Sequence, residues 1–332
     1  MCPPARVTAQ EEMPSFVAPM LARLSARLPG AEGDDSGWAF EVKWDGVRAI
    51  ARCAHGELTL RSRNGNDITT AYPELAPLAQ GLGAHDAILD GEIVAFDEHG
   101  RPSFAALQPR IHLRGEAAAH ARARGAPVTY AIFDLLWLDG ESLMDLPYGD
   151  RRALLGELDL RGEHWRVSSY QRGGGEALLA ATREQGLEGV IAKRLDSRYL
   201  PGNRAGAWLK IKHHQSQEVV IGGWSEGRGA RAGRVGALHI GVQDEHGLRY
   251  AGRVGTGFTA ATLARLGELL AARAREDSPF AGPQPPRGAH FVEPDLVCEV
   301  EFSEWTTDGM LRHPSYRGLR EDKPAAAIIR EG

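Results

Sequence analysis

Cysteine and long apolar runs are scarce in this sequence, and their scarcity excludes several classes of protein. Only Cys2, Cys53 and Cys298 occur among the 332 residues. Three thiols so far apart indicate neither a disulfide framework nor a four-cysteine zinc module. No apolar run approaches the roughly 20 residues that span a bilayer, and residues 1–10 contain no apolar secretory segment. We therefore expect a cytoplasmic protein that does not enter the membrane.

Lysine is scarce as well, although basic residues are not. Of the 39 basic residues all but five are arginines. Because arginine cannot lose its proton and act as a nucleophile, the lysines mark positions where an amine is required. Chance survival of surface lysines is the alternative. The lysines are Lys43, Lys193, Lys210, Lys212 and Lys323.

The balance of charge leaves a nucleic-acid partner open. A net charge of −5 argues weakly against such a partner, because binding to phosphates needs clustered cations. Residues 202–253 nevertheless hold eight Lys or Arg against four Asp or Glu. This local excess fits either a basic stripe that binds nucleic acid or an ordinary solvated surface.

The residue patterns predict an α+β fold with mainly antiparallel pairing, and the length favours about two domains. We expect a flexible lead-in at 1–15, a first domain at 16–213 and a second at 214–332. In the first domain, Asp45-Gly46 is typical of a hairpin turn between the first two strands. Alternation and apolar periodicity predict strands at 38–43, 47–53, 57–63, 87–96, 128–136, 189–192 and 207–211, and helices at 72–81, 148–158 and 176–185.

The pattern changes after Lys212. Residues 213–217 are polar and indicate a hinge or linker. Thr259 is suited to cap a helix over 260–273. Five or so strands around one helix are typical of a small Greek-key barrel of the OB type. We expect these strands at 218–224, 237–242, 248–254, 297–302 and 326–329.

The segment KWDGVR at 43–48 is the first candidate site. A lysine held rigidly at a strand end becomes a nucleophile when neighbouring cations favour its uncharged amine. Arg48, on the following strand, is suited to a ribose or a phosphate. Lys-x-Asp-Gly also occurs in surface hairpins, so the segment does not decide between the two readings by itself.

Two carboxylates begin or interrupt apolar strands. Glu92 follows Asp-Gly in the strand at 87–96, and Glu188 precedes the strand at 189–192. Such a pair is suited to Mg²⁺, which proteins hold through a few carboxylates together with phosphate and water. Exposed strand ends are the alternative for each. Arg63, before the Asn64-Gly65 turn, fits either a phosphate contact or an exposed turn.

The segment WLKIK at 208–212 alternates with a period of two residues. Lys210 and Lys212 therefore share one face of a strand, and Leu209 and Ile211 share the other. Two cations on one face are suited to a nucleotide α-phosphate, or else form a solvated face. Phe133 lies in an apolar strand, where it either stacks on a purine or packs in the core.

Together these blocks resemble motifs I, Ia, III, IIIa, IV and V of the covalent nucleotidyltransferase superfamily, in order. The chain resembles an ATP-dependent DNA ligase, and most closely the ligase domain of bacterial end-joining ligases of the ligase D type. The likeness runs from about Ala18 to the C-terminus. Its second half carries GGWSE at 222–226, GALHIG at 236–241, YAGRVGTGF at 250–258, EVEFSEWTTDG at 299–309 and LRHPSYRGLREDK, which looks like motif VI, at 311–323.

The resemblance implies an ATP-grasp-like adenylyltransferase domain before the OB domain, and it assigns roles toward ATP. Lys43 would form a lysyl–AMP phosphoramidate. Glu41 would contact the adenine amino group, and Phe133 would stack on the ring. Lys210 and Lys212 would hold the α-phosphate.

The resemblance also implies a metal site and a pyrophosphate site. Glu92, which also approaches the nucleotide, and Glu188 would hold a divalent cation, Mg²⁺ or Mn²⁺. Arg320, Asp322 and Lys323 of motif VI would orient the leaving pyrophosphate.

Contacts with DNA are expected from arginines. Arg48 would contact both the ribose of ATP and the nick, and Arg63 would contact phosphate in both ligands. Arg204, and Arg228 and Arg231 in the basic loop at 227–233, are further candidates for the DNA backbone.

The implied activity is sealing of nicked or broken double-stranded DNA in repair by end joining. The implied partners are a bacterial Ku-type protein and an end-joining polymerase, around a monomer that joins the nucleoid when it acts. Two alternatives stay open. One is an RNA ligase or a GTP-using capping enzyme, which shares the lysine motif. The other is a DNA-binding adaptor without activity.

Overall fold

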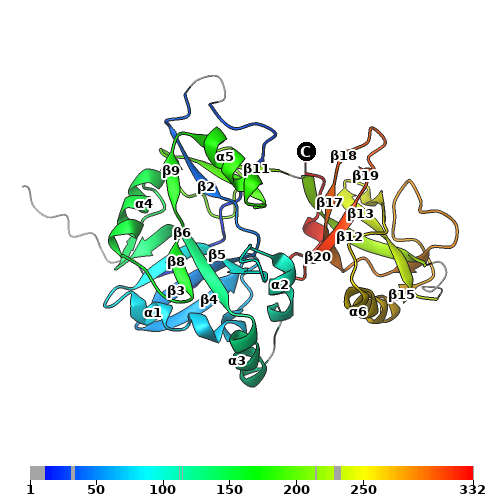
Figure 1. The fold of residues 1–332 in the computed structure, drawn as a ribbon, viewed down its shortest axis with the longest axis horizontal. Helices are drawn as coiled ribbons and strands as arrows, with labels where there is room; N and C mark the ends of the chain where they lie inside the picture. Colours follow the sequence, from blue (N-terminus) through cyan, green and yellow to red (C-terminus); the bar gives the residue numbers. More distant parts are fainter. Residues whose placement is uncertain are drawn as a thin grey trace, which may run out of the picture. The chain divides into compact units, whose positions relative to one another are not determined.

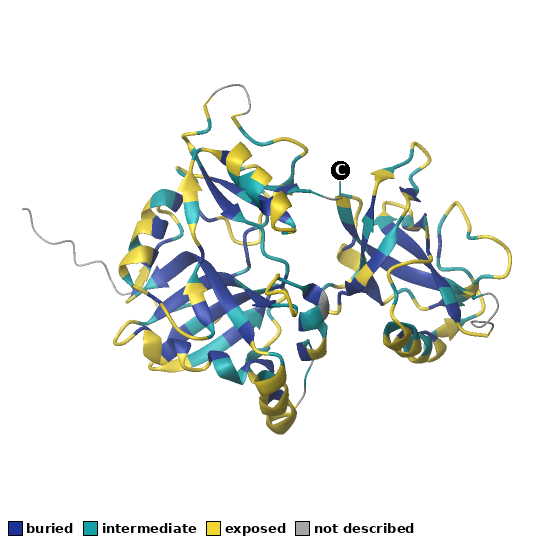
Figure 2. Ribbon diagram, viewed as in Figure 1, coloured by how far each residue is buried: buried dark blue, intermediate teal, exposed yellow. Residues whose placement is uncertain are grey.

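The computed structural model describes residues 12–30, 34–111, 113, 115–213, 215–227 and 233–331. The chain divides into two compact units, residues 1–212 and 213–332 (Figure 1). In each unit the strands are largely buried and the helices expose their outer faces (Figure 2).

The first unit contains a five-stranded sheet that carries most of the candidate site. Only its edge pair, β1 with β11, is parallel. Helix α5 (Gly175–Glu184) packs Leu178 and Leu179 against Phe40 and Val190 of this sheet. The strand order is β1 (Arg23–Leu24), β11 (Trp208–Lys212), β10 (Gly189–Arg194), β2 (Trp38–Val42) and β9 (Tyr170–Arg172).

A six-stranded sheet forms the rest of the first unit. One face packs on a large apolar cluster, and the other packs against the five-stranded sheet through Ile50, Ile88, Phe133, Tyr199 and Trp208. The order is β4 (Glu57–Ser62), β3 (Val47–Ala54), β5 (Ala87–Ala95), β6 (Val128–Leu138) and β7 (Glu141–Ser142), with β8 (Trp165–Val167) parallel to β6. The helices are α1 (Leu78–Gly81), α2 (Phe104–Leu107), α3 (Glu116–Gly125) and α4 (Tyr148–Glu157), with 3-10 turns η1 (Thr69–Ala71), η2 (Pro73–Leu75) and η3 (Gln108–Arg110).

The predicted hairpin at Asp45-Gly46 is wrong, because β2 and β3 belong to different sheets. A Cβ atom on Gly46 would lie 2.2 Å from the carbonyl oxygen of Ile93, so glycine is needed for close approach of the backbone and not for a turn. The predicted helix at 72–81 is also wrong. Pro73 and Pro77 break it into the 3-10 turn η2 and the four-residue helix α1.

The second unit contains a seven-stranded sheet, a two-stranded sheet and, among its described residues, helix α6. Helix α6 (Ala260–Ala271) begins after Thr259, whose hydroxyl accepts from the Thr262 amide, so the predicted cap is confirmed. The main sheet has the order β14 (Gly247–Val254), β13 (Val235–Asp244), β12 (Gln215–Glu226), β16 (His290–Val292) and β15 (Ala274–Arg275); β17 (Val297–Phe302) pairs with β12 and with β20 (Ser315–Leu319), and β18 (Glu304–Trp305) pairs with β19 (Leu311–Arg312).

Two predictions in the second unit are wrong. The polar segment 213–217 is not all linker, because β12 begins at Gln215 and pairs along β17 from its first residue. Residues 326–329 do not form a strand: Ala325–Ala327 is the 3-10 turn η5, and Ile329 makes only an isolated bridge to Gln243. Within the described ranges, no helix has the length and apolar character needed to cross a membrane.

Candidate active site

Three adjacent strands bring four of the predicted site residues together. Lys43 follows β2, Glu188 precedes β10, and Lys210 and Lys212 lie on β11. The Lys43 amide donates to the carbonyl oxygen of Gly189 at 2.9 Å, which extends the pairing of β2 with β10 to the lysine. The Lys43 ammonium forms an ion pair with one oxygen of Glu188, and the Lys212 ammonium lies 3.4 Å from the other.

Electrostatics keeps Glu188 ionised. Burial would raise the pKa of Glu188, but the attraction of Lys43, Lys212 and Lys210 outweighs burial and lowers the pKa to about 2. The side chains of Lys43 and Glu188 are 18% and 19% exposed. The cluster is therefore held by charge and is still open to a ligand.

Gly189 is the backbone feature that allows this arrangement. A Cβ atom there would lie 2.0 Å from the carbonyl oxygen of Ile211, and the residue has a φ of +150°. Only glycine permits both the close approach of β11 and this backbone conformation. The glycine after Glu188 thus places the carboxylate beside the lysines of the neighbouring strand.

A second group of predicted residues lies on the six-stranded sheet. Arg48 on β3 is opposite Glu92 on β5, and Phe133 lies on β6, the next strand. The Arg48 guanidinium forms a bidentate ion pair with Asp90, at 2.5 and 2.6 Å, and lies 4.5 Å from the centre of the Phe133 ring. The Tyr199 hydroxyl donates to the same carboxylate at 2.6 Å. Arg48 is therefore held in one orientation beside Phe133.

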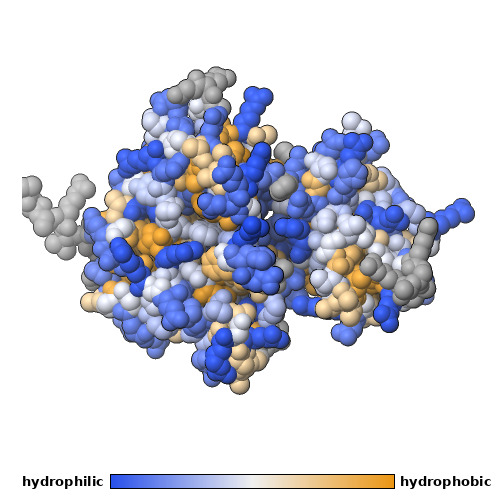
Figure 3. Space-filling view, in the orientation of Figure 1, coloured by the Kyte–Doolittle hydropathy of each residue, from blue (hydrophilic) through white to orange (hydrophobic). Residues whose placement is uncertain are grey.

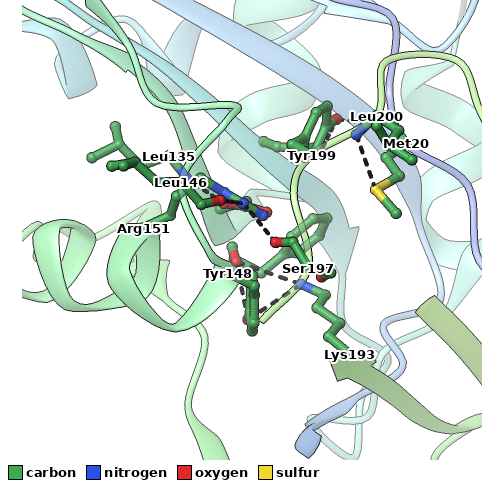
Figure 4. Close-up of polar contacts among 12 residues, drawn as sticks. Met20, Leu135, Leu146, Tyr148, Arg151, Lys193, Ser197, Tyr199 and Leu200 are labelled. Atoms are coloured by element: carbon green, nitrogen blue, oxygen red, sulfur yellow. Dashed lines mark hydrogen bonds and ion pairs between the residues drawn. The ribbon is translucent and has the colours of Figure 1, made fainter. Parts of the chain in front are cut away.

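Glu41 occupies a buried polar pocket at the junction of the two sheets. The Lys193 ammonium donates to one Glu41 oxygen at 3.0 Å, and the Tyr148 hydroxyl donates to the other. Figure 4 shows Lys193 extending from β10 toward Tyr148 on α4. Sequence reasoning assigned no role to Lys193 or Tyr148. The available signal was that Lys193 is one of few lysines and ends the Glu188 block.

Two further candidate arginines of the first unit follow β4 and precede β11. Arg63 is half-buried in the turn after β4, and Arg204 is exposed and donates to the carbonyl oxygen of Ala22 at 3.1 Å. Arg228 and Arg231 lie outside the described residues.

Hydrophilic and apolar side chains are interspersed over the face of the molecule seen in Figure 3. Across the described ranges, the large apolar side chains that are exposed are Leu146, Leu200 and Ile329. Such isolated side chains are normal and do not indicate an apolar docking surface.

The motif VI residues form a separate buried network in the second unit. Arg320, which is 9% exposed, forms a bidentate pair with Asp322 at 2.9 Å and a further contact of 3.0 Å with Glu299. Burial opposes its charge, but Asp322 and Glu299 raise the pKa of Arg320 well above its usual value. The Lys323 ammonium pairs with Glu218.

The Glu188 carboxylate suits a metal ion that takes most of its other ligands from the bound substrate and water. Within the described part of the chain, no group of three or more His, Cys, Asp or Glu side chains is arranged to hold a metal ion. Mg²⁺ is commonly bound by one or two carboxylates together with substrate phosphates and water. An ionised Glu188 beside cations that attract phosphate fits this pattern.

Comparison with protein families agrees with this geometry. Residues 19–212 match the ATP dependent DNA ligase domain, and residues 231–323 match the ATP dependent DNA ligase C terminal region. The chain therefore belongs to the family of ATP-dependent DNA ligases.

Two of the curated relatives that the chain resembles are named as bacterial end-joining proteins. The chain is 45% identical over 318 residues to the multifunctional non-homologous end joining DNA repair protein LigD of Mycobacterium tuberculosis, covering 95% of this chain and 40% of that one. It is 40% identical over 328 residues to LigD of Pseudomonas aeruginosa, covering 96% of this chain and 37% of that one. The chain thus spans well under half the length of these curated relatives.

A solved structure agrees with the fold as well. A mycobacterial DNA ligase D complexed with ATP and MES is 44% identical and has a TM-score of 0.68, over 95% of this chain and 98% of that one. These findings confirm the resemblance to ATP-dependent DNA ligases and the α+β class with an OB-type C-terminal region.

Proposed function

We propose that this chain seals DNA in three steps through Lys43. In the first, the uncharged Lys43 amine forms a bond to the α-phosphorus of ATP, and the bond to pyrophosphate breaks. In the second, a DNA 5′-phosphate oxygen displaces the lysine and takes the AMP. In the third, a 3′-hydroxyl attacks the activated phosphate and AMP leaves. The observation that carries the proposal is the cluster of Lys43, Glu188, Lys210 and Lys212 on adjacent strands.

In this proposal the chemistry depends on positioning and on charge neutralisation. Lys210 and Lys212 neutralise the α-phosphate. A carboxylate with a pKa of about 2 is a weak base, so we assign Glu188 to orienting the Lys43 amine and not to removing its proton. A divalent cation, Mg²⁺ or Mn²⁺, held by Glu92 and Glu188, would supply additional neutralisation of phosphate charge when bound.

The base and the ribose are assigned to the junction of the two sheets. Glu41 accepts from the adenine amino group, and Phe133 stacks on the ring. Arg48 contacts the ribose and later the nick, and its bidentate pair with Asp90 supports this role by holding the guanidinium in place. Arg63 is assigned to phosphate.

The second domain is assigned to the pyrophosphate and to DNA. Arg320, Asp322 and Lys323 orient the leaving pyrophosphate, which requires this domain to approach the ATP phosphates during the first step. Arg228 and Arg231 of this domain, together with Arg204 of the first domain, contact the DNA backbone. We place the functional boundary at 213/214, with 1–15 as a lead-in.

The relatives' names support a role in end joining. We propose that the substrate is nicked or broken double-stranded DNA, that a Ku-type protein and an end-joining polymerase are partners, and that the chain acts as a monomer at the bacterial nucleoid.

The test is labelling with ATP. Protein stripped of bound AMP is incubated with α-labelled ATP and Mg²⁺ or Mn²⁺ and then denatured. We expect acid-labile label on the parent and none on Lys43→Ala. Lys43→Arg serves as the matched control, because it keeps the charge but has no amine that can attack.

Label from GTP but not ATP would contradict the proposed substrate. A Lys43→Ala protein that seals nicks as well as the parent would contradict the role of the lysine. Absence of label with either metal would favour the adaptor.

A further inference from the structure

Lys193 is a buried cation outside the cluster around Lys43. It is 1% exposed and lies on β10, opposite Ala39 of β2 and Trp208 of β11. A lysine is seldom fully buried unless it is paired, because the loss of water around its charge is costly. Its partners in this structure therefore indicate what it is for.

Three aromatic rings and one carboxylate surround the Lys193 ammonium. The nitrogen lies 4.3 Å from the centres of the Phe133 and Trp208 rings and 4.8 Å from that of Tyr148. Its shortest polar contact is the 3.0 Å bond to Glu41, and it also lies 3.5 Å from the Phe133 carbonyl oxygen. Burial lowers the pKa of Lys193, and the ion pair with Glu41 and the cation–π attraction offset part of that cost.

The groups around Glu41 determine what the carboxylate can bind. Lys193 and the Tyr148 hydroxyl both donate to it, one to each oxygen. A carboxylate that carries its charge only accepts hydrogen bonds, and each oxygen has a second lone pair. A ligand that donates is therefore favoured at Glu41, and a ligand that only accepts would be repelled.

We infer that Lys193 is a positioning residue that determines which purine base the site binds. It holds the Glu41 carboxylate as a charged hydrogen-bond acceptor. A purine with a 6-amino group is therefore bound, and one with a 6-oxo group is rejected. The inference rests on the proposed contact of Glu41 with the base. Lys193 acts through Glu41 and also lies against Phe133, the residue proposed to stack on the ring.

Removal of the ammonium should change the specificity of the site and not only its stability. In Lys193→Met, Glu41 keeps Tyr148 but loses its counter-charge. A buried carboxylate without a counter-ion takes up a proton, and it can then donate to a 6-oxo group. We expect the preference for ATP over inosine triphosphate to fall by about tenfold or more, in line with the cost of a buried polar group left without its partner.

The loss should also depend on pH. The charged and titratable groups near Glu41 and Lys193 include Tyr148 and Arg152 of α4, Asp134 of β6, Tyr170 of β9 and Arg48 of β3. In Lys193→Met, a rise in pH should return the charge to Glu41 and restore part of the preference for ATP. A purely structural defect would slow both nucleotides together at every pH.

The experiment measures single-turnover labelling of the full chain by α-labelled ATP and by α-labelled inosine triphosphate, from pH 6 to pH 9. We expect Lys193→Arg, which keeps the charge, to retain the preference of the parent. The double variant Lys193→Met with Glu41→Gln removes both charges of the pair, which protects the fold if the single variant does not fold. Its preference should be weak and independent of pH.

The outcomes separate this inference from the proposed function. A parent that ATP does not label would overturn the proposed function. A parent that is labelled equally by both nucleotides would overturn the inference, as would a Lys193→Met protein that loses rate equally for both. If the single variant does not fold, a double variant that still prefers ATP as strongly as the parent would overturn the inference.

Discussion

Buried His239 predicts how the stability of the second domain depends on pH. The side chain is 1% exposed in β13, with its Nδ1 atom 3.3 Å from the Tyr250 hydroxyl and its Nε2 atom without a hydrogen-bond partner. Burial, together with the positive charge of Arg253, lowers the pKa of His239 from its ordinary value of 6.5 to about 4.

The sign follows from proton binding in the two states. Between pH 6.5 and 4 the unfolded chain binds a proton at this histidine and the folded chain does not, so the free energy of unfolding falls as pH falls. The slope is about 1.4 kcal/mol per pH unit. The fall of the pKa from 6.5 to about 4 therefore corresponds to a loss of about 3 kcal/mol, most of which has occurred by pH 4.

The assay is urea unfolding of the parent and of His239→Gln at half-unit steps from pH 7.5 to 4. The difference in unfolding free energy between parent and variant should change by about 3 kcal/mol across this range, because glutamine does not titrate. His246→Gln is the matched control, since that side chain is 75% exposed on the turn after β13. The same pH dependence in His239→Gln as in the parent would refute the reasoning.

Two further substitutions test the packing around the site. Gly189→Ala places a Cβ atom 2.0 Å from the Ile211 carbonyl oxygen. We therefore expect the free energy of unfolding in urea to fall by about 2–4 kcal/mol and labelling by ATP to be slower. In the control Gly156→Ala, the Cβ atom has open space in α4, so the change should be neutral or slightly stabilising. Arg151→Met leaves Asp134 buried without the guanidinium that contacts it at 2.8 Å, and should cost about 3–5 kcal/mol. Recovery of most of that loss in the double variant with Asp134→Leu checks the assignment, and equal stability of parent and Arg151→Met would contradict it.

Short-range patterns predicted the strand that carries the lysine pair. The alternation at 208–212 is a local property, and the structure buries Leu209 and Ile211 in one cluster while Lys210 and Lys212 are half-buried. The same pattern did not reveal that Trp208, on the face of the lysines, packs between the two sheets. That depends on which sheet covers the strand, and the periodicity of one strand does not contain this information.

Predictions that depended on the tertiary role of a residue were less successful. Asp45-Gly46 has the composition of a hairpin turn, but position 46 requires glycine because the backbone of Ile93 leaves no room for a Cβ atom. The contact of Lys193 with Glu41 joins residues 152 positions apart and exists only because β10 pairs with β2. Neither a close approach of backbones nor the register of two distant strands can be read from local composition.

The buried arginines and the buried Lys193 make different kinds of contact. Several buried arginines form bidentate pairs, including Arg48 with Asp90 and Arg151 with Asp134, where a planar fork matches a carboxylate. The ammonium of Lys193 instead makes one short contact and lies among three rings. Lys193→Arg keeps the charge, so the ratio of ATP to inosine triphosphate labelling should stay as in the parent. If charge alone is needed at that position, the binding of both nucleotides should also stay unchanged. If the compact ammonium is needed, because the larger fork displaces Phe133, arginine should weaken the binding of both nucleotides equally.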